Sequence, residues 1–256
     1  MENFYKSLLI GGLGILRAKQ LEQLQAIELD ARKMMLELAI RERANSKNIK
    51  GQLCQDLFVL YALNWKRGGF FVEFGATNGL DLSNTYLLEK DFGWNGILAE
   101  PANIWHTQLK KNRSATLDFD CVWKESGQSL EFSVAEIAEF STIASYVQSD
   151  AHKKSRKNSC SQSVTTVSLN DLLERHDAPS VIDYLSIDTE GSEFEILNAL
   201  DFNRFTISVI TCEHNFSSNR KKIYELLVHN GYKRVFQGLS RWDDWYIHSS
   251  LQRRCI

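Results

Sequence analysis

The sequence predicts an α/β fold in which a mostly parallel sheet, with a closing antiparallel strand, is covered by helices on both faces. Three observations predict this fold. Short apolar runs alternate with helical segments along most of the 256 residues, as in a doubly wound sheet. Residues 70–74 (FFVEF) are almost entirely apolar, which is typical of the buried centre of a parallel sheet. Gly75 and Gly79 follow and allow a tight turn that brings the backbone close to a ligand.

The first half of the alternating pattern ends at residue 134. Residues 52–65 predict a helix with an apolar face, and Gly68 and Gly69 end it. The elements expected after the glycine turn are a helix at 83–92 that Gly93 ends, a strand at 96–100, a helix at 104–111, a strand at 116–123 and a hairpin arm at 126–134. Such an order gives parallel neighbouring strands joined by crossover helices.

The second half begins with a polar segment, residues 140–163, which lacks a hydrophobic period and predicts a surface insertion. Its basic run 152–157 is either a solvated loop or a lid for an anionic acceptor. The elements expected next are a strand at 164–169, a helix at 170–176 with Asn170 as its N-cap, a strand at 181–188, a helix at 193–199, a strand at 205–212 and a helix at 220–229. Residues 233–237 and 245–248 predict a final antiparallel pair.

Residues 1–50 have a different pattern of apolar residues from the rest of the chain. They predict an N-terminal helical extension to a single α/β domain at 51–256. Apolar residues between Leu16 and Leu38 recur at mostly three- and four-residue steps, which indicates an amphipathic helix. Such a helix packs on the domain or on its twin in a homodimer, and the alternative is peripheral membrane contact. The apolar run at 8–16 is too short to span a bilayer.

Composition narrows the class of partner and the compartment. The net charge is −2, from 30 basic and 32 acidic residues, and this balance gives no sign of nucleic-acid binding. The five cysteines are odd in number and form no C-x-x-C pair. They therefore predict neither a disulfide framework nor a zinc site, and a reducing, cytoplasmic location is expected.

Acidic residues follow each of five predicted strands. In an open α/β sheet, ligands bind beyond the carboxyl ends of the strands, near the point where the strand order reverses. The polar residues at these ends are Glu73, Glu100, Asp120, Asp188, Glu190 and Glu213, with His214 next in the chain. One such carboxylate is often a helix cap or solvated, but the whole set predicts a binding crevice.

The position of Glu73, two residues before Gly75, distinguishes this turn from a dinucleotide-binding turn. A carboxylate there would repel a pyrophosphate, but it can hold the cationic amino-acid end of S-adenosylmethionine. Glu100 can accept both ribose hydroxyls, and Asp120 either accepts from the adenine amino group or belongs to a sheet-edge turn. The turn therefore predicts the cofactor site of a methyltransferase, with the residues Glu73, Phe74, Gly75, Ala76, Asn78, Gly79, Glu100, Pro101, Asp120 and Asp188.

Methyl transfer to a hydroxyl benefits from a general base, by about 10²–10⁴-fold. His214 is the first candidate because histidine titrates near neutral pH, and Asp188 is the second. For His214 the alternative is a neutral ring that bridges backbone groups. The predicted catalytic residues are His214, Asp188, Glu190 and Glu213, and the same four can also form a divalent-metal site. We favour the interpretation without metal, because the carboxylates suffice as hydrogen-bond acceptors.

Several ordered sequence blocks resemble the FkbM family of S-adenosylmethionine-dependent methyltransferases. The blocks are GGFFVEFGATNGLDLSNTYLLEKDFGWNGILAEP at 68–101, SLNDLL at 168–173, IDYLSIDTEGSEFEIL at 182–197 and ITCEHN at 210–215. The resemblance implies a Rossmann-like class I methyltransferase fold and methyl transfer to oxygen, often to a sugar hydroxyl. It assigns Glu73, Gly75, Ala76, Gly79 and Glu100 to cofactor binding, and Asp188, Glu190 and Glu193 to the active site. Thr189 stands where the family commonly has an aliphatic residue.

The predicted function is therefore an S-adenosylmethionine-dependent O-methyltransferase that acts on a sugar hydroxyl of a glycan or natural product. Trp242, Trp245 and Tyr246 either stack on a sugar face or pack in the core. Two alternatives remain open. One is a non-catalytic binding or trafficking module that retains the fold, and the other is a metal-assisted O-methyltransferase of a non-sugar small molecule.

Overall fold

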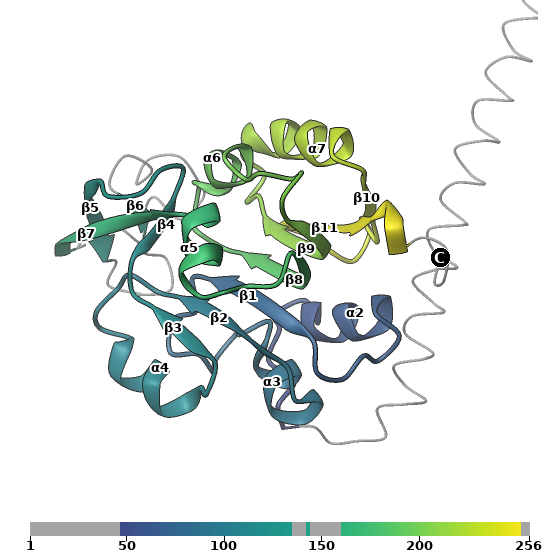
Figure 1. The fold of residues 1–256 in the computed structure, drawn as a ribbon, viewed down its shortest axis with the longest axis horizontal. Helices are drawn as coiled ribbons and strands as arrows, with labels where there is room; N and C mark the ends of the chain where they lie inside the picture. Colours follow the sequence, from purple (N-terminus) through teal and green to yellow (C-terminus); the bar gives the residue numbers. More distant parts are fainter. Residues whose placement is uncertain (1–46, 135–141, 144–159, 252–256) are drawn as a thin grey trace, which may run out of the picture.

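The computed structural model describes residues 47–134, 142–143 and 160–251, and a seven-stranded sheet lies at its centre (Figure 1). The strands are β1 (Phe70–Phe74), β2 (Asn95–Ala99), β3 (Thr116–Asp118), β8 (Val181–Ile187), β9 (Thr206–Glu213), β10 (Tyr232–Val235) and β11 (Asp243–His248). Their order across the sheet is β10-β11-β9-β8-β1-β2-β3. β11 is antiparallel to both neighbours, and the other pairs are parallel. The predicted mostly parallel sheet with a closing antiparallel strand is confirmed.

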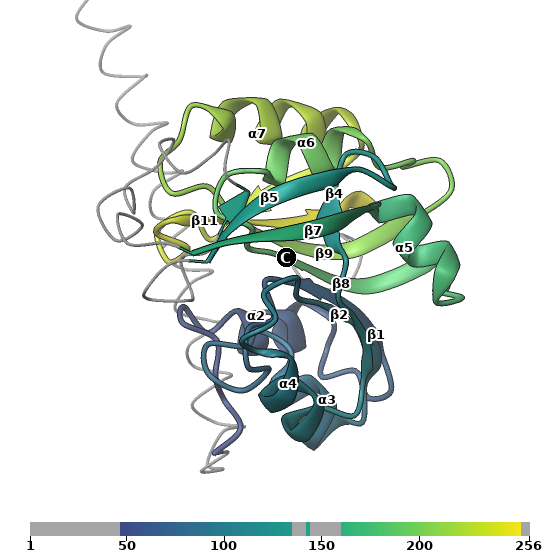
Figure 2. The same ribbon diagram turned by 90° about the vertical axis from the view of Figure 1, so that its left-hand side faces the viewer.

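Helices cover both faces of this sheet (Figures 1 and 2). One face carries α2 (Gln55–Ala62), α3 (Tyr86–Phe92) and α4 (His106–Asn112), and the other carries α5 (Leu169–Arg175), α6 (Glu193–Asn198) and α7 (Asn219–His229). Phe71 and Leu98 belong to one core cluster, whereas Val72 and Ile97 belong to the other. Successive strand residues point to opposite faces, so strands that are apolar throughout fill both cores. The short 3-10 helix η4 (Ser249–Leu251) follows β11.

The strand order reverses between β1 and β8. The chain proceeds from β1 outward through β2 to β3, and then returns to place β8 and β9 on the other side of β1. The loops that leave β1 and β8 therefore run in opposite directions and leave a crevice at the carboxyl ends of these strands. This reversal brings the glycine turn after β1 next to the acidic segment after β8.

The predicted strand at 116–123 is two short strands in different sheets, β3 and β4 (Cys121–Trp123). The Asp118 carboxylate accepts the backbone N–H of Asp120 at 2.9 Å, and this turn breaks the strand. β4 joins β5 (Ser129–Val134), β6 (Thr142–Ile143) and β7 (Cys160–Ser168) in a four-stranded sheet of order β4-β7-β5-β6 (Figure 1). The hairpin arm at 126–134 corresponds to β5, but this second sheet as a whole was not predicted.

The predicted polar insertion at 140–163 is wrong at two places, because residues 142–143 form β6 and residues 160–163 begin β7. The basic run 152–157 lies outside the described residues, as does nearly all of the predicted extension at 1–50. Within the described ranges, no helix is both long enough and apolar enough to cross a membrane.

The N-cap of α5 is Ser168, two residues before the predicted Asn170. The Ser168 hydroxyl accepts the backbone N–H of Asp171, which satisfies one of the free donors of the first turn. Asn170 lies inside the helix, where its side chain bonds the Ala199 carbonyl and the Asp201 N–H. This amide therefore ties α5 to the end of α6.

Burial raises the pKa of Asp243, at the start of β11, to about 7, although the Gln55 amide donates to its carboxylate at 2.7 Å. The folded state thus holds this proton more tightly than the unfolded state, in which the pKa of the group is 3.8. The resulting stabilisation is complete below pH 3.8 and is lost as the pH rises through 7. We expect Asp243→Asn to gain stability relative to the parent by up to about 4 kcal/mol between pH 4 and pH 8. Urea unfolding at each pH measures this difference, and a difference independent of pH would contradict it.

Candidate active site

A cavity of about 480 Å³ lies at the carboxyl ends of β1, β2, β8 and β9, a volume typical of small-molecule sites. Nine of the predicted site residues line it: Glu73, Phe74, Gly75, Ala76, Glu100, Pro101, Asp188, Glu190 and Glu213. These residues come from four strand ends, as the rule for open α/β sheets predicts. Asn78, Gly79, Asp120 and His214 are not among the residues that line it.

Gly75 forms the sharp turn after β1. Its φ is +68°, and a Cβ at this position would lie 2.1 Å from the carbonyl oxygen of Asp188. The β1 turn and the end of β8 are therefore in backbone contact, which no residue with a side chain allows. The N–H groups of Gly75 and Ala76 donate to the Ala99 carbonyl, so the turn is also fixed to β2.

The Glu73 carboxylate holds the loop that follows the glycine turn. It accepts the Asn84 N–H at 2.8 Å and the hydroxyls of Ser83 and Thr85. The guanidinium of Arg113 lies 3.6 Å from it. Glu73 lines the cavity as predicted, but its oxygens are also bonded to the protein itself, so its first role here is to shape the wall of the cavity.

Arg113, at the end of α4, is a structural residue of this site that the sequence did not indicate. Its fully buried side chain donates to Glu89 at 2.7 Å, to the Ser83 hydroxyl at 3.0 Å and to the Thr85 hydroxyl at 2.8 Å. It also explains Gly79, because a Cβ there would lie 2.6 Å from the Arg113 side chain. Gly79, whose φ is +72°, is thus required by its close packing against the end of α4.

Arg113→Lys is expected to lower the free energy of unfolding by about 3 kcal/mol, because one ammonium group cannot replace the several bonds of a buried guanidinium. Urea denaturation checks this value. The matched control is Arg67→Lys, whose exposed guanidinium donates to the Asp91 carbonyl at 2.7 Å. That change should stay within about 0.5 kcal/mol, and equal losses in the two variants would contradict the prediction.

Glu100 lies at the end of β2. Its two oxygens accept the backbone N–H groups of Thr77 and Ala102, each at 2.8 Å, so the carboxylate is fixed in the cavity wall. Burial and, to a smaller extent, the nearby Asp188 raise its pKa to about 7. A carboxylate held in this way can accept additional hydrogen bonds from the hydroxyl groups of a ligand.

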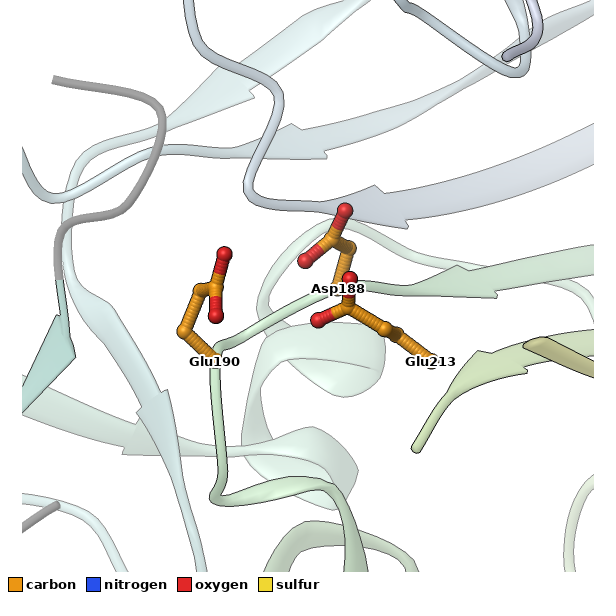
Figure 3. Close-up of side chains that lie close together, drawn as sticks. All are labelled: Asp188, Glu190 and Glu213. Carbon is orange, nitrogen blue, oxygen red and sulfur yellow. The ribbon is translucent and has the colours of Figure 1, made fainter. Parts of the chain in front are cut away.

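Asp188, Glu190 and Glu213 converge on one point of the cavity, with an oxygen of each within 4.8 Å of the others (Figure 3). Glu190 is a non-glycine residue with a φ of +57°, and the Asn215 amide donates to it at 3.3 Å. Burial raises the pKa of Asp188, and burial together with Asp188 raises the pKa of Glu213 far above its usual value. A hydrogen bond joins Asp188 to Glu213. A hydrogen bond between two carboxyl groups requires a proton on one of them, and the larger upward shift favours Glu213 as its holder.

His214 does not face this cavity, which corrects its prediction as general base and as a fourth metal ligand. Its Nδ1 accepts the backbone N–H of Phe216 at 2.9 Å, and its Nε2 lies 3.8 Å from the Asp244 carboxylate. Burial lowers its pKa. A ring that accepts at Nδ1 is the neutral, backbone-bridging histidine of the alternative interpretation. The metal-ligating group among the described residues contains the three carboxylates only.

The remaining predicted residues stabilise loops beside the cavity. The Asn78 side chain accepts the N–H groups of Leu80 and Asp81. Asp120 bonds Arg175 at 2.8 Å, so the structure favours the sheet-edge turn over a contact with adenine. Glu193 accepts the N–H groups of Thr189 and Gly191. Asn78 and Glu193 bond their own segments of chain and Asp120 bonds α5, and none of the three lines the cavity.

The cavity also has residues that the sequence did not predict. Cys121, Val122 and Phe132 line it from the second sheet, and Asn215 lines it from the segment after β9. Of the three aromatic residues named from the sequence, Trp242 lines the cavity, whereas Trp245 and Tyr246 are buried in the core. Asn215 directly follows the predicted Glu213 and His214, and this position was the available signal. No sequence signal pointed to the second-sheet residues, because they reach the cavity through the pairing of strands that are far apart in the sequence.

The carboxylates that line the cavity fit S-adenosylmethionine. Carboxylates at the ends of β1, β2 and β8 suit the cationic groups and ribose hydroxyls of this compound, and the volume suits a molecule of its size. Together with the antiparallel β11 between β9 and β10, these features define a Rossmann-like class I methyltransferase that uses S-adenosylmethionine. A family model described as Methyltransferase FkbM domain matches residues 73–234. The chain belongs to this family, as the sequence blocks predicted.

Solved structures with a similar chain path include two whose titles name a methyltransferase, one of them putative, and one titled as a fibrillarin/Nop5p complex. Precorrin-6y C5,15-methyltransferase from Geobacter metallireducens is 13% identical, with a TM-score of 0.41, and the match covers 80% of this chain and 90% of that chain. A putative RNA methyltransferase from Pyrococcus horikoshii is 11% identical, with a TM-score of 0.38 and coverage of 77% and 82%. The fibrillarin/Nop5p complex gives 11% identity, a TM-score of 0.35 and coverage of 77% and 80%. No curated protein sequence matches the chain.

Proposed function

We propose that the protein transfers a methyl group to a hydroxyl oxygen of a sugar, in a glycan or a natural product. The observation that carries this proposal is the convergence of Asp188, Glu190 and Glu213 in one cavity with the turn of Gly75 and the carboxylate of Glu100. Carboxylates accept hydrogen bonds from neutral hydroxyl groups. The same charges would repel phosphate groups, which supports a neutral acceptor and argues against nucleic acid.

S-adenosylmethionine supplies the electrophilic methyl group when it is bound. The chain must then orient the acceptor oxygen and take up its proton. Glu213 is the protonated member of its pair with Asp188, because its pKa is raised the more strongly. Asp188 is the ionised member, and its raised pKa makes it a stronger base than an ordinary aspartate. We assign Asp188 as general base and Glu190 as the group that orients the acceptor.

A transfer assay with methyl-labelled cofactor tests this function against nucleotide sugars, lipid-linked glycans and small polyketides. The expected result is label on a sugar hydroxyl oxygen, located in the purified product by NMR. Label on nitrogen or carbon, or on non-sugar acceptors alone, would contradict the proposal. Calorimetry with the cofactor alone is the control that shows whether the preparation is competent to bind.

A metal-assisted reaction on a non-sugar small molecule is the second candidate, since the three carboxylates are ligands that Mg²⁺ or Ca²⁺ accepts. A bound cation would lower the pKa of the acceptor hydroxyl. The assay therefore includes a chelator arm. Loss of transfer that added Mg²⁺ restores would favour the metal-assisted reaction, and unchanged transfer would favour Asp188 acting alone.

We also propose a cytoplasmic location. Cys121 and Cys212 are buried free thiols, and Cys54 is an exposed one, which suits a reducing compartment. Fractionation of cells that produce the protein tests this proposal. Membrane contact or dimerisation through residues 1–46 stays a prediction, because these residues lie outside the described ranges.

A further inference from the structure

Two exposed apolar side chains lie on segments that border the cavity. The large apolar side chains that are exposed among the described residues are Leu82, Ile104, Val181, Phe216, Tyr224 and Val228. Leu82 is 47% exposed and lines the cavity, and Phe216, at 71%, directly follows the cavity residue Asn215. Trp242 lines the cavity as well. We call Leu82, Phe216 and Trp242 the apolar collar.

The backbone at the collar is strained. Leu82 has a φ of +60°, Phe216 has a φ of +55°, and Asn215 between the collar and the active site has a φ of +41°. Non-glycine residues with a large side chain adopt this conformation at a cost of about 1–2 kcal/mol each. Folding gains little from these two side chains, because both remain exposed to solvent. Strain that places apolar groups in solvent beside a cavity indicates contact with a ligand.

Hydrogen bonds fix the Phe216 and Trp242 segments of the collar relative to each other. The N–H of His214 donates to the Trp242 carbonyl at 2.9 Å, and the N–H of Asn215 donates to the same oxygen at 3.3 Å. The Phe216 N–H donates to the ring of His214. Two parts of the collar that are distant in the sequence are thereby joined through their backbones. A surface organised before binding loses less conformational entropy when a ligand binds.

We propose that the apolar collar binds an apolar group of the methyl acceptor. This group lies next to the hydroxyl that Glu190 orients and Asp188 deprotonates. The acceptor is then an amphipathic glycoside and not a free sugar or a nucleotide sugar. Charge supports this choice, since the acidic cavity disfavours phosphates while the collar adds apolar contact area. The inference rests on the proposed function only in taking this cavity as the acceptor site.

Calorimetry with two matched probes tests the collar, in the presence of S-adenosylhomocysteine. The probes are octyl β-D-glucopyranoside, kept below its micelle concentration, and methyl β-D-glucopyranoside. The octyl compound should bind at least about 10-fold more tightly, because it adds seven methylene groups that the collar can cover. Phe216→Ala and Leu82→Ala, on separate loops, should each weaken octyl glucoside binding by about 5-fold. Phe216→Ala, which is outside the cavity lining, should not change the affinity for methyl glucoside or S-adenosylhomocysteine by more than about twofold.

Val181→Ala is the matched control, because Val181 is 58% exposed at the start of β8, the opposite end of that strand from Asp188. It should leave both glucoside affinities unchanged. Equal binding of the two probes, absence of binding by both included, would overturn the proposal, as would an equal effect of Val181→Ala. Binding does not require transfer, so the two proposals fail separately. An octyl preference without methylation of any sugar refutes the sugar acceptor alone, and sugar methylation without that preference refutes the collar alone.

Discussion

Gly75→Ala is expected to abolish binding of S-adenosylmethionine and to lower the free energy of unfolding by about 4 kcal/mol. The added Cβ would lie 2.1 Å from the Asp188 carbonyl oxygen, at a φ of +68°. A backbone oxygen cannot move aside as a flexible side chain can, so the turn after β1 and the acidic segment after β8 must separate. Calorimetry with the cofactor should show an affinity loss of at least about 100-fold, and urea unfolding gives the stability.

Gly93→Ala separates this collision from the general cost of a left-handed residue. Gly93 ends α3 with a φ of +67°, and a Cβ there meets nothing within 4 Å. The expected cost is about 1 kcal/mol, with cofactor affinity unchanged. If both alanine variants lost the same stability and both bound cofactor, the close contact between the two strand ends would not be what requires Gly75.

Asp188→Asn is expected to lower kcat by about 10²–10⁴-fold, because the amide cannot accept the proton of the acceptor hydroxyl. The measurement uses the acceptor found by the transfer assay, and calorimetry shows whether cofactor affinity stays within about tenfold. Glu213→Gln should cost only about tenfold in kcat, because glutamine keeps a donor to Asp188 as the protonated glutamate does.

His214→Asn is the matched comparison for that experiment. The asparagine oxygen can accept the Phe216 N–H in place of Nδ1, so kcat should remain within about fivefold of the parent value. A loss as large as that of Asp188→Asn would show that the imidazole takes part in proton transfer and would contradict the assignment of Asp188.

Local sequence signals were sufficient where a residue's role depends on its own segment. The apolar run at 70–74 and the glycines beside it predicted β1 and its turn, because burial on both faces and a positive φ each leave a direct mark on residue type. Gly93 likewise marked the end of α3. The carboxylates that follow β1, β2, β8 and β9 indicated the cavity, since strand ends of a parallel sheet meet at one edge.

Side-chain direction was the main source of error. Glu213 and His214 are adjacent in the chain, yet the glutamate lines the cavity while the imidazole bonds the Phe216 N–H and lies beside Asp244. Asp120 also follows a strand, but Arg175 binds it outside the cavity. The sequence states which residues stand near the carboxyl edge of the sheet and does not state which way each side chain turns.

The sequence by itself determined the class of fold, the family and the edge of the sheet at which the carboxylates gather, because periodicity and glycine positions are local properties. The tertiary structure decided which of those carboxylates converge on one point, brought residues of the second sheet into the cavity wall, and placed Arg113 against the loop that borders the cavity. These contacts join segments that are far apart in the chain, and their energies depend on burial and distance, which exist only after the chain has folded.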